Sequence, residues 1–144
     1  MTTKEKGNIG ESKIIYEFVK RGIQVSIPFG DNSRYDLIAD FNNKLNKIQI
    51  KYSSAVVQNG SINLKCRSSY NHTTNKHART YQNDVDYIAF YIDRWDLALL
   101  VPIKEVGNRK TINFRKDATA NGQLRNTHHV QDYLFDKIIN APIA

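Results

Sequence analysis

The chain has 144 residues, of which 40% are hydrophobic and 24% are charged, and it carries a formal net charge of +7 with a pI near 9.5. Its single cysteine, Cys66, excludes an intrachain disulfide and a thiolate zinc cluster. The N-terminus lacks the apolar run of a signal peptide and the longest apolar stretches are too short to cross a bilayer, which predicts a cytoplasmic protein without a membrane partner.

Hydrophobic periodicity and turn-forming residues predict the secondary structure in chain order. Segments with helical spacing of apolar residues are separated from alternating or continuously apolar runs by stretches rich in glycine, asparagine and serine. The predicted elements are a helix over 11–20 after a flexible Gly7–Gly10 segment, a strand over 23–27, a loop over 29–33, hairpin strands over 34–40 and 47–52, strands over 61–65, 86–92 and 96–101, a helical turn over 102–106, an edge strand over 111–114 and a helix over 128–139.

This order of elements predicts the fold class. A helix, a run of strands and a final helix give an α/β (α+β) layout, in which a mixed β-sheet core is flanked by helices. The length favours one domain over 1–144, and no internal repeat or linker divides it.

The predicted hairpin brings three polar side chains together. Opposite residues of an antiparallel pair have numbers with a constant sum, which a turn at Asn42-Asn43 sets at about 85, so that Asp36 lies opposite Gln49. Gln49 and Lys51 are two residues apart and share a face, whereas the isoleucines beside them point to the core. The sequence therefore predicts that all three polar side chains meet at one edge of the sheet.

A carboxylate beside an amide and a lysine suits metal-dependent hydrolysis of phosphodiesters. Mg²⁺ prefers oxygen ligands and usually takes one or two carboxylates. We expect Asp36 to anchor such an ion, with the Gln49 side-chain oxygen and the Ile50 carbonyl as neutral ligands. Glu11 offers a second carboxylate, and Lys51 is expected to orient or deprotonate the attacking water and to stabilise charge on the phosphate. The same spacing also occurs by chance on solvated hairpins, so the pattern alone leaves both interpretations open.

The positive charge is concentrated in one window. No aspartate or glutamate lies between Asp40 and Asp84, and this window holds seven lysines and arginines, whereas the rest of the chain has 14 basic and 14 acidic residues. An acid-free basic stretch of this kind is typical of contact with a polyanion, most often nucleic acid.

Three segments of the chain match a known group of nucleases. Gly7–Glu11, Val25–Leu37 and Ile48–Lys51 together resemble the PD-(D/E)xK nuclease superfamily, and more narrowly its group I intron-encoded homing endonuclease branch, over about the first 52 residues. The resemblance implies a restriction-endonuclease-like fold with a mixed sheet flanked by helices.

The resemblance also assigns roles by position. It implies Asp36 as the metal-binding carboxylate, Lys51 as the catalytic lysine and Glu11 as the helix-borne acid. Two positions depart from the pattern: Tyr35 stands where the superfamily name has proline, and Gln49 replaces the usual second acid. Glutamine is a known variation at this position of the superfamily, so we expect an active site that comprises Glu11, Asp36, Gln49 and Lys51.

Two basic polar segments are predicted to contact DNA as loops near 66–81 and 109–129. Both mix arginine and lysine with residues able to contact phosphates or base edges. The candidate DNA-binding residues are Arg67, Asn71, His72, Lys76, His77, Arg79, Arg109, Lys110, Arg115, Lys116 and Arg125.

Together these features predict a site-specific double-strand DNA endonuclease of the homing type that uses Mg²⁺ or another divalent cation such as Mn²⁺. One active site per chain and two strands per duplex predict a homo-oligomer, either a dimer or a tetramer. Two alternatives stay open: a structure-selective nuclease like a Holliday-junction resolvase, and a non-catalytic DNA-binding protein with a degenerate nuclease fold, which the amide at Gln49 favours.

Overall fold

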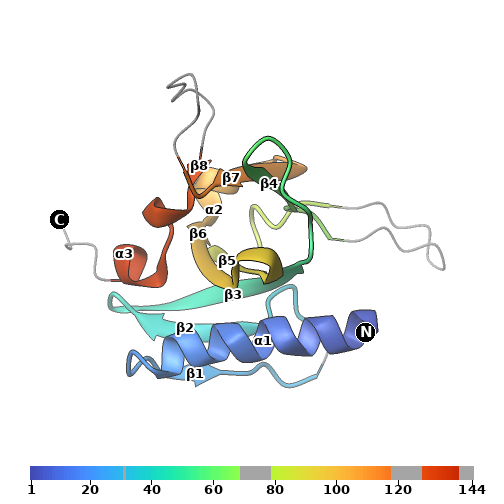
Figure 1. Cartoon of the computed structure of the whole chain (residues 1–144). Helices are drawn as coiled ribbons and strands as arrows, with labels where there is room; N and C mark the ends of the chain where they lie inside the picture. The colour runs from blue at the N-terminus through green and yellow to red at the C-terminus, as the bar shows by residue number, and fades with distance from the viewer. Residues whose placement is uncertain (31, 69–78, 118–127, 140–144) are drawn as a thin grey trace.

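The protein is built in three layers (Figure 1), seen in a computed structural model that describes residues 1–30, 32–68, 79–117 and 128–139. A long helix covers one face of a five-stranded sheet, and a three-stranded sheet packs on the other face. The elements are α1 (Thr3–Val19), β1 (Val25–Ser26), β2 (Leu37–Phe41), β3 (Lys44–Ser53), β4 (Ser61–Lys65), β5 (Tyr87–Ile92), the 3₁₀ helix η1 (Asp93–Trp95), β6 (Leu97–Pro102), α2 (Ile103–Val106), β7 (Thr111–Arg115), β8 (His128–His129), the 3₁₀ helix η2 (Val130–Asp132) and α3 (Phe135–Ile139).

The larger sheet is mixed, as predicted. Its strand order is β1-β2-β3-β5-β6, and β3 and β5 run parallel whereas the other neighbours run antiparallel. Strand β5 is paired on both edges and buried on both faces, which explains why its sequence is continuously apolar. Phe90 enters the core shared with β4 and β7, and its neighbour Ala89 enters the core shared with α1.

Helix α1 begins eight residues earlier than the sequence analysis predicts, and the expected flexible Gly7–Gly10 segment is helical. A capping box fixes this start, because the Glu5 amide donates to the Thr2 hydroxyl at 3.1 Å and the Thr2 amide donates to the Glu5 carboxylate at 2.7 Å. Gly10 is buried against β3, where an added Cβ would lie 3.2 Å from the Cβ of Tyr52. This glycine allows α1 to pack closely on the strand that carries the candidate site.

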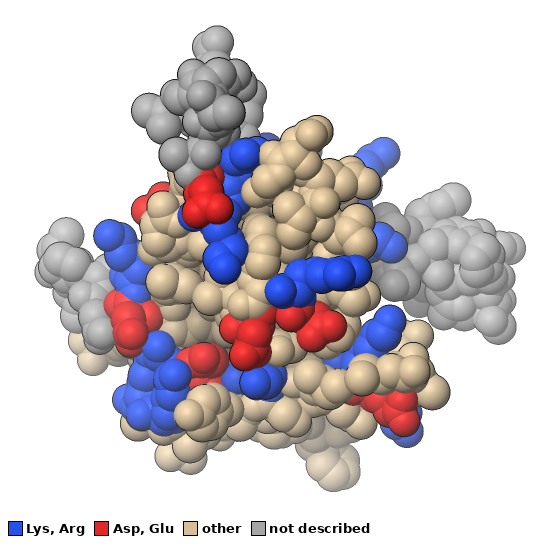
Figure 2. All heavy atoms as spheres, in the orientation of Figure 1, with Lys and Arg blue, Asp and Glu red and all other residues tan. Residues whose placement is uncertain are grey.

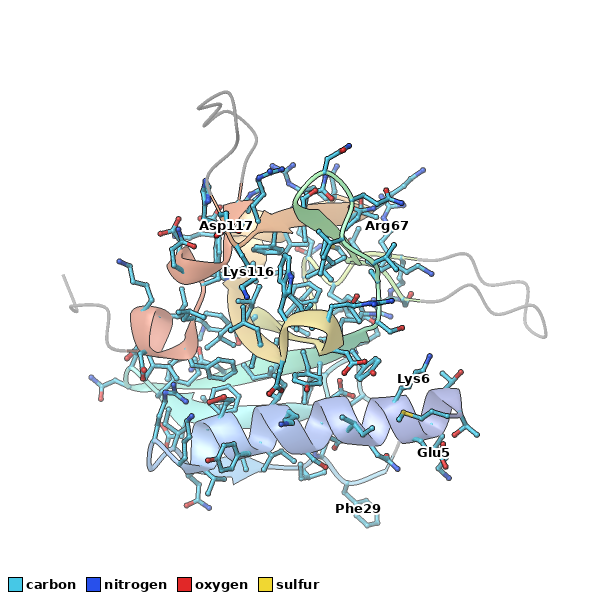
Figure 3. All side chains as sticks on the ribbon, viewed as in Figure 1. Glu5, Lys6, Phe29, Arg67, Lys116 and Asp117 are labelled. Atoms are coloured by element: carbon cyan, nitrogen blue, oxygen red, sulfur yellow. The ribbon has the colours of Figure 1, made fainter. Side chains whose placement is uncertain are left out.

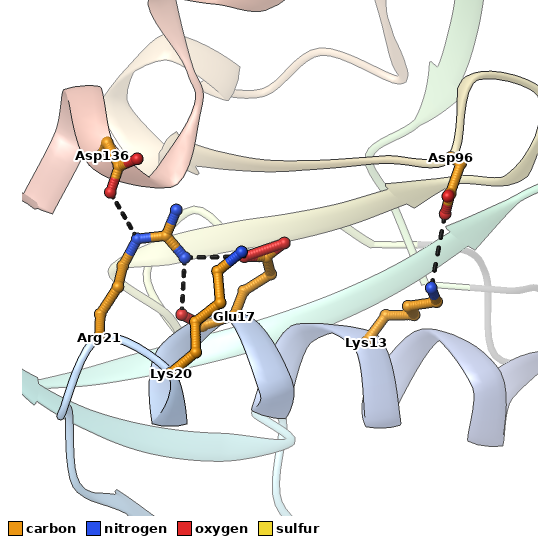
Figure 4. Close-up of polar contacts among 6 residues, drawn as sticks. All are labelled: Lys13, Glu17, Lys20, Arg21, Asp96 and Asp136. Carbon is orange, nitrogen blue, oxygen red and sulfur yellow. Dashed lines mark hydrogen bonds and ion pairs between the residues drawn. The ribbon is translucent and has the colours of Figure 1, made fainter.

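Ion pairs link the C-terminal end and the middle of α1 to other parts of the molecule (Figure 4). At its C-terminal end, Arg21 contacts Glu17 and Asp136 of α3, each at 2.7 Å. Nearer its middle, Lys13 lies 3.5 Å from Asp96, in the turn between β5 and β6. Ion pairs with an exposed partner, such as Lys13–Asp96 and Arg21–Asp136, stabilise a fold only slightly, so α1 is held mainly by its buried apolar face.

Three further predictions about elements differ from the structure. Strand β7 is the central strand of the smaller sheet and not an edge, because β4 pairs on one side and β8 on the other. The helix expected over 128–139 is divided into β8, η2 and α3, since His128 and His129 pair with β7 before the chain turns. The strand expected over 23–27 is reduced to Val25–Ser26.

None of the described helices is both long and apolar enough to pass through a membrane.

Candidate active site

The candidate site lies beside β3, at the point where β2 begins. The two strands are joined by a turn in which Asn42 and Asn43 have φ values of 54° and 60°, the left-handed geometry that favours a two-residue hairpin. The buried side chain of Asn46 donates to the carbonyls of Phe41 and Lys44 at 3.1 and 2.9 Å. These contacts fix the predicted register, in which the numbers of paired residues sum to 85.

Asp36 is the first residue beyond the paired part of β2. Its backbone amide donates to the Ile48 carbonyl at 2.8 Å, so that it leaves the ladder instead of pairing with Gln49 as the sequence analysis expects. Its carboxylate reaches the open edge of β3 and accepts a hydrogen bond of 2.7 Å from the Ile50 amide. Because the pairing of β2 with β3 ends at Leu37, the Asp36 carboxylate can bind a backbone amide of β3 that β2 leaves unpaired.

Glu11, Asp36, Gln49 and Ile50 line one cavity of about 310 Å³, the metal-site cavity, together with Lys4, Gly7, Asn8 and Tyr52. The Gln49 side chain donates to the Ile50 carbonyl at 3.3 Å. Glu11 and Asp36 also border a smaller hollow of about 240 Å³ beside the 27–33 loop. The structure therefore brings both predicted carboxylates and both predicted neutral ligands to one place.

This set of donors fits a hard divalent cation. Two carboxylates and two neutral oxygens are the ligand types that Mg²⁺ and Mn²⁺ take, with waters filling the remaining positions. The described residues contain no cluster of three or more histidine, cysteine, aspartate or glutamate side chains, so a metal here depends on the neutral oxygens of Gln49 and Ile50.

Lys51 lies next to this cavity but lines a neighbouring cleft. Its ammonium donates to the Arg67 carbonyl at 3.0 Å and lies 4.9 Å from the centre of the Tyr81 ring. Arg34 stacks on the same ring at 4.3 Å and also pairs with Asp84 at 3.0 Å. The lysine is therefore held by an aromatic ring that a second cation also contacts.

Burial shifts the pKa of both charged groups toward their neutral forms. It raises the pKa of Asp36 above its usual value, against the opposing effects of the Ile50 amide and the Lys51 charge. It lowers the pKa of Lys51, against the opposing effect of Asp36. The two side chains are thus close enough for each charge to stabilise the other.

The residues predicted to bind DNA are spread over several parts of the molecule. Arg67 lies beside Lys51, and the exposed Arg79 contacts Asp84 at 3.3 Å. Arg109 and Lys110 are exposed before β7, Arg115 is half-buried at its end, and Lys116 lies 5.9 Å from the Trp95 ring. The remaining candidates, Asn71, His72, Lys76, His77 and Arg125, lie outside the described residues.

Arg34, Tyr81 and Asp84 form a cluster beside Lys51 that the sequence does not predict. Arg34 donates to the Thr80 carbonyl at 2.8 Å as well as to Asp84, and so joins the start of the hairpin to the segment before β5. No local pattern links positions this far apart, because only the tertiary fold brings them together.

The chain is similar to known nucleases in sequence and in fold. The sequence profile of the PD-(D/E)XK endonuclease family matches residues 1–136. Among solved structures, the chain is similar to a bacterial homing endonuclease, I-Ssp6803I, with 27% sequence identity and a TM-score of 0.69 over 88% of this chain and 86% of that one. A search of curated proteins found no match. The family match and the structural similarity confirm the resemblance predicted from the sequence.

Proposed function

Since the chain belongs to the PD-(D/E)XK endonuclease family, we propose that it is a divalent-metal-dependent endonuclease of the homing type that cuts both strands of DNA at a specific site. The observation that carries this proposal is the cavity where Glu11, Asp36, Gln49 and Ile50 meet beside Lys51. The similarity to a bacterial homing endonuclease supports DNA as the substrate and a specific site as the target.

We propose Asp36, Gln49, the Ile50 carbonyl and Glu11 as the residues that hold the ion, which is Mg²⁺ or Mn²⁺. Nucleases of this family generally use divalent metals, and a bound ion supplies Lewis-acid stabilisation of the phosphate and lowers the pKa of its water. Glu11 provides the second negative charge that the amide of Gln49 lacks.

Lys51 contributes through its position and its lowered pKa. A lysine that releases its proton more easily than usual can take a proton from the attacking water, and in its charged form it stabilises the phosphate oxygens. The Arg67 carbonyl and the Tyr81 ring hold its ammonium near Asp36. Because these contacts already order the Lys51 side chain, less conformational entropy is lost when the substrate binds.

The predicted DNA contacts and assembly belong to the same proposal. The segments near 66–81 and 109–129, the second of which includes strand β7, supply the cations that contact the duplex, Arg67 and Arg109 among them. The described residues provide one metal-site cavity per chain, and two strands require two, so we propose a homo-oligomer, either a dimer or a tetramer. Light scattering on the purified protein, with and without DNA, measures this state.

The test is digestion of genomic DNA in Mg²⁺, followed by capture and sequencing of the new ends. A site-specific enzyme gives paired ends at one recurrent position, and EDTA abolishes them. Asp36→Ala and Lys51→Ala are expected to lose the cut, whereas Asp132→Ala, which removes an exposed carboxylate from η2, keeps it.

Other outcomes identify the alternatives. Faster cutting of a branched duplex than of linear DNA, with ends spread over many sequences, indicates a structure-selective nuclease. Salt-sensitive binding without cutting in Mg²⁺ or Mn²⁺ indicates a non-catalytic DNA-binding protein. Persistent cutting by Asp36→Ala contradicts the assignment of the site.

A further inference from the structure

A second hollow, the basic cleft, lies beside the metal-site cavity. It has a volume of about 510 Å³ and is formed by the first turns of α1, the end of β3 with the residues that follow it, and β4. Four cations line it, namely Lys6, Lys51, Lys65 and Arg67, and the described lining contains no aspartate or glutamate. Lys6 and Arg67 lie on the same side of the molecule (Figure 3).

The lining differs in its charge from those parts of the surface where cations are paired with carboxylates. On the face shown in Figure 2, acidic and basic side chains are interspersed. Within the described part of the chain, Lys13, Lys20, Arg21, Arg34, Lys44 and Arg79 each lie within 4.0 Å of a carboxylate. Lys6, Lys65 and Arg67 have no such partner among the described residues, so their charges remain available to an anion.

Arg67 is held in the lining by a hydrogen bond from its guanidinium. One terminal nitrogen of its guanidinium donates to the Asn108 carbonyl at 3.0 Å. Its Nε is buried and, among the described atoms, has no hydrogen-bond partner. Because that atom is not exposed to solvent, the placement of Arg67 in the lining, and not its Nε, supports a phosphate contact.

The basic cleft and the metal-site cavity are adjacent. Gly7, Ile50 and Tyr52 line both of them. A Cβ added to Gly7 would have no atom within 4 Å, so the helix backbone is open to solvent at this shared residue. A chain of phosphates that has one member beside Asp36 can therefore continue toward Lys65.

The remaining lining suits a sugar–phosphate backbone. Thr3, Ser53, Ser54 and Asn63 offer hydroxyl and amide donors between the cations. Contacts of this kind, from lysine, arginine, serine, threonine and asparagine, are the ones that proteins make to phosphates and sugars without reading base sequence.

We propose that Lys6, Lys65 and Arg67 bind the backbone of the cleaved DNA strand and hold the phosphates next to the one that is cut. This inference rests on the proposed function and adds a positioning site to it, since Lys6 and Lys65 were not among the predicted DNA contacts. Their role is to fix the strand in register with the metal-site cavity, which supplies the chemistry.

The experiment compares Lys6→Gln and Lys65→Gln with Lys137→Gln. Lys137 is an exposed lysine of α3. Helix α3 contacts the C-terminal end of α1 through Asp136, whereas the cleft lies at the N-terminal end of α1. All three variants lose one positive charge, so the control removes the effect of net charge. Binding of a short mixed-sequence DNA duplex is measured in EDTA by fluorescence anisotropy over a series of KCl concentrations.

Each cleft variant is expected to weaken binding several-fold and to reduce the slope of log K against log[KCl] by about 0.9, the value for one lost phosphate contact. Lys137→Gln is expected to keep the wild-type slope. Lys6→Arg and Lys65→Arg keep the charge and are expected to retain the slope, which separates a phosphate contact from a loss of packing. Thermal melts of the same samples identify any variant that does not fold, and Lys6→Met or Lys65→Met then replaces it.

The inference is overturned if the cleft variants show the slope and affinity of Lys137→Gln while the wild-type chain binds and cuts DNA. A wild-type chain that neither binds duplex nor cuts it overturns the proposed function instead. The two failures are therefore distinguishable.

Discussion

The metal-site cavity and the basic cleft share three residues but carry opposite chemistry. The first gathers two carboxylates and two amides with one lysine, and the second gathers four cations with no acid in its described lining. Ile50 marks the division, because its amide binds Asp36 on the cavity side while Lys51, the next residue, lines the cleft. The difference indicates that cutting and strand binding depend on different side chains, and that substitutions can separate them.

The largest expected effect is the loss of cutting in Asp36→Asn with DNA binding retained. Loss of the ligand carboxylate removes several kcal/mol of metal-dependent stabilisation, about 10³-fold or more in rate. Binding stays equal or becomes tighter, because a negative charge near the phosphates is removed. Parallel cleavage and anisotropy assays measure the two quantities, and equal losses in both would contradict the division between the cavity and the cleft.

The same variant is expected to stabilise the metal-free protein near neutral pH. A raised pKa means that the contribution of Asp36 to stability is fully present below its unfolded-state pKa and is lost as the pH rises through its folded-state pKa. At neutral pH the wild type therefore carries a charged carboxylate at a cost that asparagine avoids. Thermal melts in EDTA at neutral and acidic pH should show a Tm gain for Asp36→Asn that shrinks in acid.

Lys51→Arg separates proton transfer from charge. Arginine keeps the positive charge but does not release its proton, so a role as base predicts a loss of about 10²-fold. Because the pKa of Lys51 is lowered, the wild-type rate should rise with pH through that pKa, and this limb should disappear in Lys51→Arg. If Lys51→Arg cuts DNA at the wild-type rate at every pH, Lys51 does not act as a base and its role is electrostatic only.

A smaller effect is expected from moving the second negative charge within the cavity. Glu11→Gln should slow cutting about 10-fold, a loss of about 1.4 kcal/mol, because Gln49 cannot replace its charge. The double variant with Gln49→Glu restores the charge from β3 and should recover most of the rate. A double variant no faster than Glu11→Gln would show that Glu11 acts by some means other than its charge.

The site was predictable where local chemistry determines geometry. Asn42-Asn43 specifies a two-residue turn, the turn fixes the register, and the register places Asp36 and Gln49 at one edge. The one departure from the predicted register is also local: Asp36 does not pair with Gln49, and its carboxylate instead accepts a hydrogen bond from the Ile50 amide.

The sequence also contains a signal for the start of α1, which the prediction of a later start did not use. Thr2 and Glu5 form a capping box three residues apart, whereas the glycines that follow favoured a flexible segment. Tertiary packing explains why a glycine is kept at position 10, because it lies against Tyr52.

Other features depend on contacts between distant segments. Lys6 and Lys65 line one cleft only because the tertiary fold brings the first turns of α1 and strand β4 to the same end of β3. Strand β7 becomes central only because β8 returns to its second edge. Periodicity along the chain carries no information about such pairings, and this limits what sequence alone predicts about the surface that binds DNA.

The smallest expected effect compares the two glycines of α1. Alanine in place of glycine inside a helix gains about 0.8–1 kcal/mol, and at Gly7 nothing opposes the gain because an added Cβ meets no atom within 4 Å. At Gly10 the added Cβ would lie 3.2 Å from that of Tyr52, so Gly10→Ala should gain less or lose stability. Urea unfolding measures both. If Gly7→Ala is more stable but cuts DNA more slowly, a side chain at this position obstructs the DNA strand that passes over the helix. If the variant cuts as fast as wild type, the DNA strand takes another path between the cavity and the cleft.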